Sequence, residues 1–336
     1  SIVPIIFITF LIPGVVYGIA SGSVKTHRDV VAGMAKSMSG MGYYIVMAFF
    51  CAQFIYAFGQ SNLGALLAIK GAIFELRNIF QTIQSADGNI TLRAPANVSL
   101  SIVNANSNSD GTLGDVIVTA DYAGVGGGLS NDTGAISDNL TGEAANITGD
   151  QVALRAGSGI GDGVAPNDAD IDVAIVTLAA VTVSGDIHVQ DLAGGLAIDS
   201  FDGLSGVTIM DAVAPLDSGN DHITIRASSP LTVSTGDPVV NNDGGNIVLA
   251  AEGNAAGDDL TLDDNVTATG GSGNISLYAG DTISLTGTIT VSAAGSGAVL
   301  GMAGTSYNNG APINGTNAGD VSMADGTTIQ SADGDI

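Results

Sequence analysis

The sequence contains no tryptophan, a single cysteine and few basic residues. With only Cys51 available, no disulfide can form within the chain, so packing and backbone hydrogen bonds must hold the fold together. Eight lysines and arginines stand against 33 acidic residues, for a net charge of −25. Beyond Arg77 the only lysines or arginines are Arg93, Arg155 and Arg226. A region this acidic repels phosphate, which excludes nucleic-acid binding, and is more compatible with divalent cations or simple solubility.

Charge and apolarity are distributed unevenly along the chain. The mean hydropathy is +0.39 although the net charge is −25, an unusual pair of values for a single environment. Up to Phe80 there are five positive and two negative residues, net +3, which leaves −28 for the remainder. The seven are Lys25, Arg28, Asp29, Lys36, Lys70, Glu75 and Arg77. We therefore predict a lipid-embedded segment (1–79), a junction (80–84) and a water-exposed acidic region (85–336).

The first segment contains two long uncharged runs. Residues 1–20 carry no charge and have about the length that a bilayer core requires of a helix. A secretory signal peptide is the alternative, but no basic residue precedes the run. The basic loop that follows, with Lys25, Arg28 and Lys36, is predicted to be cytoplasmic by the positive-inside rule. A second uncharged run covers 37–67, so we expect residues 1–67 to contact the lipid bilayer.

Polar residues interrupt the second run at Gln60, Ser61 and Asn62. Polar groups at membrane depth usually face a bundle interior or a substrate path, because lipid cannot satisfy their hydrogen bonds. The alternative is that these residues form the interfacial end of the helix.

Several motifs of this segment occur in one known family with the same order and spacing. They are Tyr17-Gly18, Met41-Gly42, the AQF at 52–54 and Ser61-Asn62-Leu63-Gly64. On these motifs, residues 1–79 resemble the p-aminobenzoyl-glutamate transporter (AbgT) family. The resemblance implies a many-helix secondary transporter that forms a homodimer and moves aromatic carboxylates by ion coupling. It also implies that Ser61, Asn62 and Gly64 line the substrate path. Two helices cannot enclose a midplane site, so we expect no transport by this segment alone.

The acidic region repeats one short phrase. A Gly or Asp, then Asn or Asp, precedes alternating apolar residues, as in DGNITLRA (87–94), NDHITIRA (220–227), GGNIVLAAEG (244–253) and SGNISLYAGD (272–281). Alternation predicts strands buried on one face, and we expect the glycines to supply positive φ in the turns. The units recur about every 26 to 36 residues, which is typical of stacked repeats. The fold class predicted is therefore mixed: transmembrane helices followed by an all-β region, a parallel β-solenoid or alternatively a β-sandwich array.

Residues 83–336 are similar in composition to filamentous-haemagglutinin-like repeat proteins of bacteria. That resemblance implies export, an extracellular or cell-surface location, and an adhesive or structural role.

The strongest candidate for chemistry in the acidic region is a run of alternating carboxylates. Asp162, Asp168, Asp170 and Asp172 could surround calcium, a cation that prefers oxygen ligands; the alternative is a solvated acidic turn. His188 and His222 occupy similar places in two repeats, as a shared metal site or as outward-facing strand positions.

No catalytic motif is present, so we expect no enzyme. Many aspartates nevertheless leave a polysaccharide-active β-helix enzyme as an alternative, since glycoside hydrolysis needs two carboxylates at a set separation.

The two regions predict different functions. One is a fragment of a transporter, and the other is a structural or adhesive solenoid. The chain begins without methionine and stops within a repeat, so we expect a fragment, with a chimeric join of two unrelated genes as an alternative. If one gene encodes both, the helices are a membrane anchor with both chain ends outside.

Overall fold

The computed structural model describes residues 2–60, 82–122, 129, 133–161, 170–210, 220–253, 255–308, 311–314 and 318–336. The chain divides into two compact units, Ser1–Phe80 and Gln81–Ile336.

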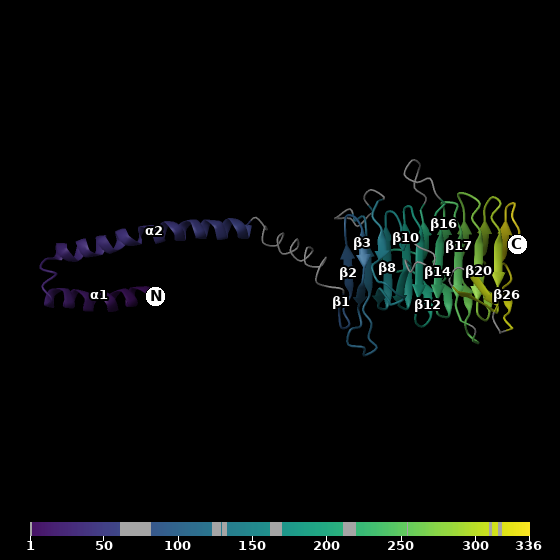
Figure 1. Cartoon of the computed structure of the whole chain (residues 1–336), viewed down its shortest axis with the longest axis horizontal. Coiled ribbons are helices and arrows are strands. Elements are labelled where there is room, and N and C mark those ends of the chain that lie inside the picture. Colours follow the sequence, from purple (N-terminus) through teal and green to yellow (C-terminus); the bar gives the residue numbers. More distant parts are fainter. Residues whose placement is uncertain are drawn as a thin grey trace. The chain divides into compact units, whose positions relative to one another are not determined.

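The first unit is a helical hairpin. Helix α1 (Ile2–Ala20) and helix α2 (His27–Gln60) run in opposite directions on either side of a short turn (Figure 1). Among the described residues, no helix is both long enough and apolar enough to cross a bilayer. The membrane spans predicted at 1–20 and 37–67 therefore stay predictions.

The turn explains one motif of the sequence. At the end of α1 the Gly18 carbonyl accepts hydrogen bonds from the backbone N–H groups of Ser23 and Val24, at 3.0 Å each. A Cβ on Gly18 would lie 2.7 Å from a methyl carbon of Val24. A larger residue at this position would therefore force the Val24 side chain to shift.

The second unit is built almost entirely from parallel strands, so the predicted all-β region is confirmed. A nine-stranded sheet contains β1 (Thr82–Gln84), β4 (Ile102–Asn104), β7 (Ile147–Thr148), β9 (Ile171–Ala174), β11 (Ile187–Asp191), β14 (Ile223–Ala227), β17 (Ile247–Ala251), β20 (Ile275–Ala279) and β23 (Val299–Met302). Two smaller pairs are the parallel β3 (Val98–Leu100) and β6 (Ile136–Asp138), and the antiparallel β24 (Thr305–Asn308) and β25 (Ala311–Asn314).

A 14-stranded sheet starts as one row of strands and then divides into two. The single row is β2 (Ile90–Arg93), β5 (Val116–Thr119), β8 (Gln151–Ala156) and β10 (Thr177–Thr182). One branch is β12 (Leu196–Ile198), β15 (Leu231–Val233), β18 (Leu260–Leu262), β21 (Ile283–Leu285) and β26 (Val321–Met323). The other is β13 (Val207–Ile209), β16 (Val239–Asn241), β19 (Val266–Ala268), β22 (Thr290–Ala293) and β27 (Thr328–Ser331).

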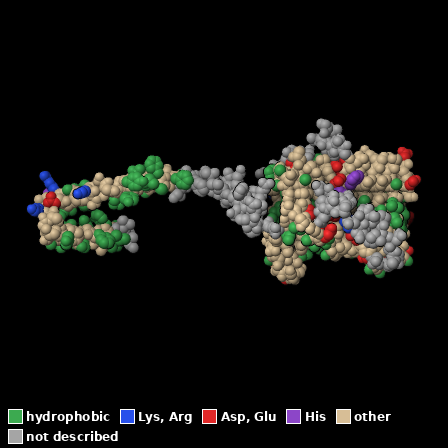
Figure 2. All heavy atoms as spheres, in the orientation of Figure 1, with side chains coloured by type: hydrophobic (Ala, Val, Ile, Leu, Met, Phe, Trp, Pro, Cys, Tyr) green, Lys and Arg blue, Asp and Glu red, His purple; other side chains and the backbone are tan. Residues whose placement is uncertain are grey.

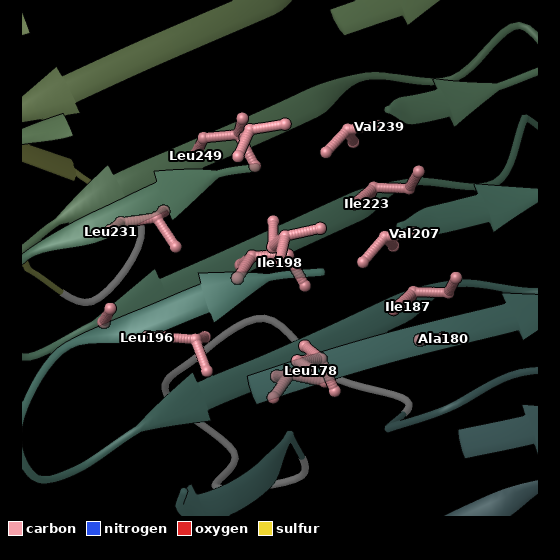
Figure 3. Packing of buried hydrophobic residues seen from close by; sticks show 14 of the residues in the cluster. Leu178, Ala180, Ile187, Leu196, Ile198, Val207, Ile223, Leu231, Val239 and Leu249 are labelled. Carbon is pink, nitrogen blue, oxygen red and sulfur yellow. The ribbon is translucent and has the colours of Figure 1, made fainter. Parts of the chain in front are cut away.

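From β11 to β22 the strands come in groups of three, and each group pairs strand for strand with the next. We call these groups rungs: rung 1 is 187–209, rung 2 is 223–241, rung 3 is 247–268 and rung 4 is 275–293. Equivalent residues stack in register, so that Leu231 pairs with Leu260 and Leu260 with Ile283. Figure 3 shows the inward side chains of neighbouring rungs lying over one another, as Leu196 and Leu231 do.

The grouping of strands changes at β10 and β11. The six-residue β10 pairs through Thr177–Leu178 with β12 and through Ala180–Thr182 with β13, so one long strand is followed by two short ones. On the opposite side β11 joins two earlier rows, because Val189–Asp191 pairs with β9 while Ile187 bridges to Ile160. One core nevertheless continues through the change, from Ile90 to Val299.

The repeated Gly-Asn phrase has a role that differs from the predicted one. A Cβ on Gly245 would lie 1.9 Å from the carbonyl oxygen of Asp221, and one on Gly273 would lie 1.9 Å from that of Gly245. Close stacking of turn backbones, rather than positive φ, requires glycine at these two positions. Positive φ does apply at Gly185, where φ is +80°.

The asparagine of the phrase links neighbouring rungs. The Asn246 side-chain oxygen accepts the backbone N–H of Asn274 at 2.8 Å, and Asn274 accepts that of Ala298 at 2.8 Å. In rung 2 the equivalent position is His222, whose Nδ1 accepts the N–H of Asn246 at 2.8 Å. His222 therefore substitutes for asparagine as a hydrogen-bond acceptor, with Nδ1 unprotonated.

Candidate functional site

The helical hairpin exposes large apolar side chains along both helices. Phe10 and Tyr17 are each 76 % exposed on α1, and Tyr43 is 71 % exposed on α2. Charged side chains collect near the turn, where Lys25, Arg28, Asp29 and Lys36 lie (Figure 2). This separation gives the hairpin an apolar surface and one charged end.

Asp29 fixes the start of α2. Its Oδ2 accepts backbone N–H groups from Thr26 at 2.7 Å and Lys25 at 3.0 Å. The bond from Thr26, with that from Lys25, holds the pKa of Asp29 below its ordinary value. The carboxylate therefore reaches back to the N–H groups of the two residues that precede α2, as in a capping box.

The residues predicted for the substrate path, Ser61, Asn62 and Gly64, lie outside the described residues. So do Asp162 and Asp168 of the predicted calcium run. Asp170 and Asp172 are described, at the start of β9 in the nine-stranded sheet, and both are buried.

Asp170 and Asp172 belong to a buried polar group on the outer side of that sheet. Register places Asp172 beside Gln190 of β11, and Gln190 beside Arg226 of β14. Outward positions of a strand usually face solvent, yet Asp172 is 1 % exposed and Arg226 is 8 % exposed. We call these residues, with His188 and Glu252, the outer polar cluster.

Arg226 is the centre of the outer polar cluster. Its Nε donates to Glu252 Oε1 at 2.7 Å, and its Nη1 lies 3.7 Å from Asp170 Oδ2. Burial raises the pKa of Glu252; the guanidinium of Arg226 opposes that rise, and the carboxylates of Asp170 and Glu143 add to it. Asp170 directly precedes β9 and Glu252 directly follows β17, so the one guanidinium links β14 to the ends of two other strands.

This geometry bears on the calcium hypothesis. The positive charge of Arg226 lies beside Asp170, where it competes with any cation for the carboxylate. Within the described ranges, no group of three or more His, Cys, Asp or Glu residues is placed to hold a metal ion. Calcium at the predicted run therefore stays a prediction, without support from Asp170.

The two histidines do not form a shared metal site in the described structure. His188 is 1 % exposed, and its Nε2 lies 3.1 Å from Asp186 Oδ2. The other oxygen of Asp186 accepts the backbone N–H of His222 at 2.6 Å. Burial alone would raise the pKa of Asp186, but the hydrogen bonds from His188 and His222 lower it below its ordinary value. Asp186 therefore joins rungs 1 and 2.

The arginines of the β-region contact residues of the fold itself. Arg155 forms an ion pair with Asp202 at 2.7 Å, and Arg93 lies over the ring of Tyr122, 5.1 Å from its centroid. What sequence reasoning missed is the partner of each arginine. For Arg226 the sequence does contain a signal for its partner, because Glu252 lies 26 residues later, close to one repeat length.

Comparison with known proteins bears on the helical hairpin. A model of the AbgT putative transporter family matches residues 1–109. The p-aminobenzoyl-glutamate transport protein of Escherichia coli (strain K12) is 37% identical over 69 residues. The N-terminal segment resembles the AbgT transporters.

The AbgT-like segment is a small part of such a protein. The aligned residues are 20% of this chain and 14% of the E. coli transporter. The family match continues past residue 79, where we expected the AbgT resemblance to stop, and includes β1 to β4. The similarity indicates a membrane location for the N-terminal segment. No solved structure matches the chain.

Proposed function

We propose that the N-terminal unit is a membrane-embedded hairpin of AbgT type that anchors the β-region. The observation that carries this proposal is the row of exposed apolar side chains on α1 and α2, Phe10 and Tyr43 among them. In water such surfaces are unfavourable by roughly 25 cal/mol for each Å² of apolar area, whereas lipid tails cover them without that cost. The AbgT similarity supports the same location.

In a complete AbgT-type protein this hairpin would contribute to a path for p-aminobenzoyl-glutamate, with Ser61, Asn62 and Gly64 as path residues and with two protomers associated. Two helices alone cannot enclose a substrate. The exposed apolar side chains of α1 and α2 support the anchor role directly.

For the β-region we propose a parallel β-solenoid with a structural or adhesive role at the cell surface. The strand-for-strand parallel pairing of successive rungs supports it, as does the single core running through them. A β-sandwich array would instead pair its strands mainly antiparallel. No lysine and only three arginines follow Arg77, which keeps this surface acidic and soluble.

Membrane flotation of the full chain tests the anchor. We expect the chain to float with membranes after carbonate extraction, and a variant with Phe10→Asp and Val16→Asp to be partly released, because two carboxylates on α1 are costly in lipid. Flotation separates membrane-bound chain from aggregate. Val321→Asp, at an exposed apolar residue of β26, is the matched control and should float like the unmodified chain. Unmodified chain that stays at the bottom of the gradient would contradict the anchor.

A further inference from the structure

We propose that His222 is a proton-sensitive link between rungs 2 and 3, which opens when its imidazole takes up a proton. His222 directly precedes β14, and Asn246 directly precedes β17. Nδ1 of His222 accepts the backbone N–H of Asn246 at 2.8 Å. A ring nitrogen has one lone pair, which either accepts a hydrogen bond or holds a proton. Protonation of Nδ1 and the link to Asn246 therefore exclude one another.

The link is one step of a ladder of side-chain acceptors at the corner where each rung enters the nine-stranded sheet. At each step a side chain accepts the backbone N–H of the equivalent residue in the next rung, and the strands that follow pair in register. The steps are Asp186 to His222 at 2.6 Å, His222 to Asn246 at 2.8 Å, Asn246 to Asn274 at 2.8 Å and Asn274 to Ala298 at 2.8 Å. We call this series the acceptor ladder. Every step joins one rung to the next in the same way.

His222 is the step of the acceptor ladder whose charge changes near neutral pH. The amides of Asn246 and Asn274 do not titrate. Burial raises the pKa of Asp186, but the hydrogen bonds from His188 and His222 outweigh that effect and hold it below its ordinary value, so this carboxylate stays an acceptor. Histidine is the side chain that ordinarily changes charge between about pH 5 and 8. A proton therefore acts on the ladder between rungs 2 and 3.

The packing of the corner leaves the protonated ring no way to keep the link. A Cβ on Gly245 would lie 2.9 Å from Nδ1 of His222, so the turn backbone lies directly against this edge of the ring. With a proton on Nδ1, two hydrogens face each other there. Rotation of the ring by half a turn brings a carbon atom to the same place, and carbon accepts no hydrogen bond. The N–H of Asn246 must then turn to water.

The other titratable groups around this corner hold bonds of their own. They are Asp186, His188, Asp221 and Asp243. Nε2 of His188 lies 3.1 Å from Asp186, on the carboxylate oxygen that does not contact His222. Asp243 accepts the backbone N–H of Asp221 at 2.7 Å, and Asp221 accepts that of Gly185. These bonds, and the backbone pairing of β14 with β17, do not involve the His222 ring. We therefore expect the opening to be confined to the link at Asn246.

Amide hydrogen exchange of the full chain in mild detergent, resolved to single residues, tests this link. Protection is expressed relative to the intrinsic exchange rate at each pH. We expect the protection of the Asn246 amide to fall about 3- to 10-fold from about pH 8 to about pH 5, the effect of one hydrogen bond. The Asn274 amide, whose acceptor is the uncharged Asn246 side chain, should keep its protection in the same sample.

Two variants assign the effect to one histidine. His222→Asn places at this corner the residue found at the equivalent position of rungs 3 and 4, and should keep the Asn246 amide protected at both pH values. His222→Gln, also an uncharged acceptor, serves if that variant folds poorly. His188→Gln removes the other histidine of the β-region and should keep the pH-dependent loss at Asn246.

Three outcomes overturn the proposal. One is equal protection of the Asn246 amide at both pH values in the unmodified chain. Another is an equal fall at Asn246 and Asn274, which would show a general loosening of the β-region. The third is a fall at Asn246 that persists without His222 or disappears in His188→Gln, since the proton would then act elsewhere. None of these outcomes depends on whether the hairpin enters a membrane.

Discussion

Replacement of Leu262 by aspartate is expected to abolish the cooperative unfolding of the β-region, whereas the same replacement of neighbouring Thr261 should leave it intact. Both residues lie in β18, one position apart, and therefore point to opposite sides of the strand. Leu262 is fully buried between Val233 and Leu285 of the adjacent rungs. Burial of an unpaired carboxylate there costs several kcal/mol, comparable to the whole stability of a typical domain.

Far-UV circular dichroism during thermal unfolding measures this difference. Thr261→Asp should unfold cooperatively within a few degrees of the unmodified chain, because surface changes usually alter stability by about 0.5 kcal/mol or less. Equal losses in the two variants would show that β18 does not have one buried and one exposed side, and would contradict the stacked-rung arrangement.

Asp191→Asn is expected to stabilise the β-region at alkaline pH and to have little effect in acid. Asp191 ends β11, is fully buried and has one oxygen, Oδ2, without a hydrogen-bond partner. Burial raises its pKa to about 7, against only weak opposition from the N–H groups of Ile175 and Ala193. Asparagine keeps an oxygen for the N–H of Ile175 but carries no charge to bury.

The direction in which stability changes with pH follows from the raised pKa of Asp191. Below about pH 4 Asp191 is uncharged in the folded and the unfolded chain, so the folded chain has its full stability. This stability is lost as the pH rises through about 7, where the buried carboxyl ionises. The variant should therefore exceed the unmodified chain by about 2–4 kcal/mol at pH 8, and this difference should disappear near pH 4. Urea unfolding across that range measures it, and Asp325→Asn controls for the loss of one negative charge. A difference that does not change with pH would show that folding does not raise the pKa of Asp191.

The all-β nature of the region was predictable because each rung repeats the same alternation. Ile223, Ile247 and Ile275 begin equivalent strands after the same kind of turn, and the structure stacks them in register. A period of two residues identifies a strand with one buried side regardless of what lies beside it. Pairing partners follow once the repeat length is known.

The regrouping of strands at β10 and β11 could not be predicted in the same way. The six-residue β10 alternates like any other strand, and only its two sets of partners show that the row divides there. The outer polar cluster was missed for a related reason. The sequence places Arg226 in a repeat strand, and only the register reveals that Asp172 and Gln190 lie beside it on neighbouring strands. The number of residues between equivalent positions of neighbouring rungs depends on loop lengths, which vary from rung to rung.

For the Gly-Asn phrase the predicted turns are correct, but the predicted reason for glycine, a positive φ, is wrong at Gly245 and Gly273. The sequence indicated turns, and turns are present. Gly245 and Gly273 are nevertheless required by the carbonyl oxygens of the preceding rung, which no single repeat contains. The asparagines likewise act between rungs rather than within their own turn. Local sequence therefore identifies the turn, while the reason for its composition lies in the neighbouring repeat.

In the proposed arrangement one chain combines a hairpin in lipid with a β-region outside the membrane. Cys51 offers a native reporter, because it is the single cysteine, lies on α2 and has an exposed side chain in the hairpin taken alone. Labelling intact cells with a membrane-impermeant maleimide measures whether lipid covers it. As a reference, Ser322→Cys in a Cys51→Ser background places the thiol on the exposed face of β26.

We expect the Ser322→Cys variant to be labelled from outside, and Cys51 to react only after detergent is added. Labelling of Cys51 in intact cells at the rate of the reference thiol would show that α2 faces water, and would contradict the membrane anchor.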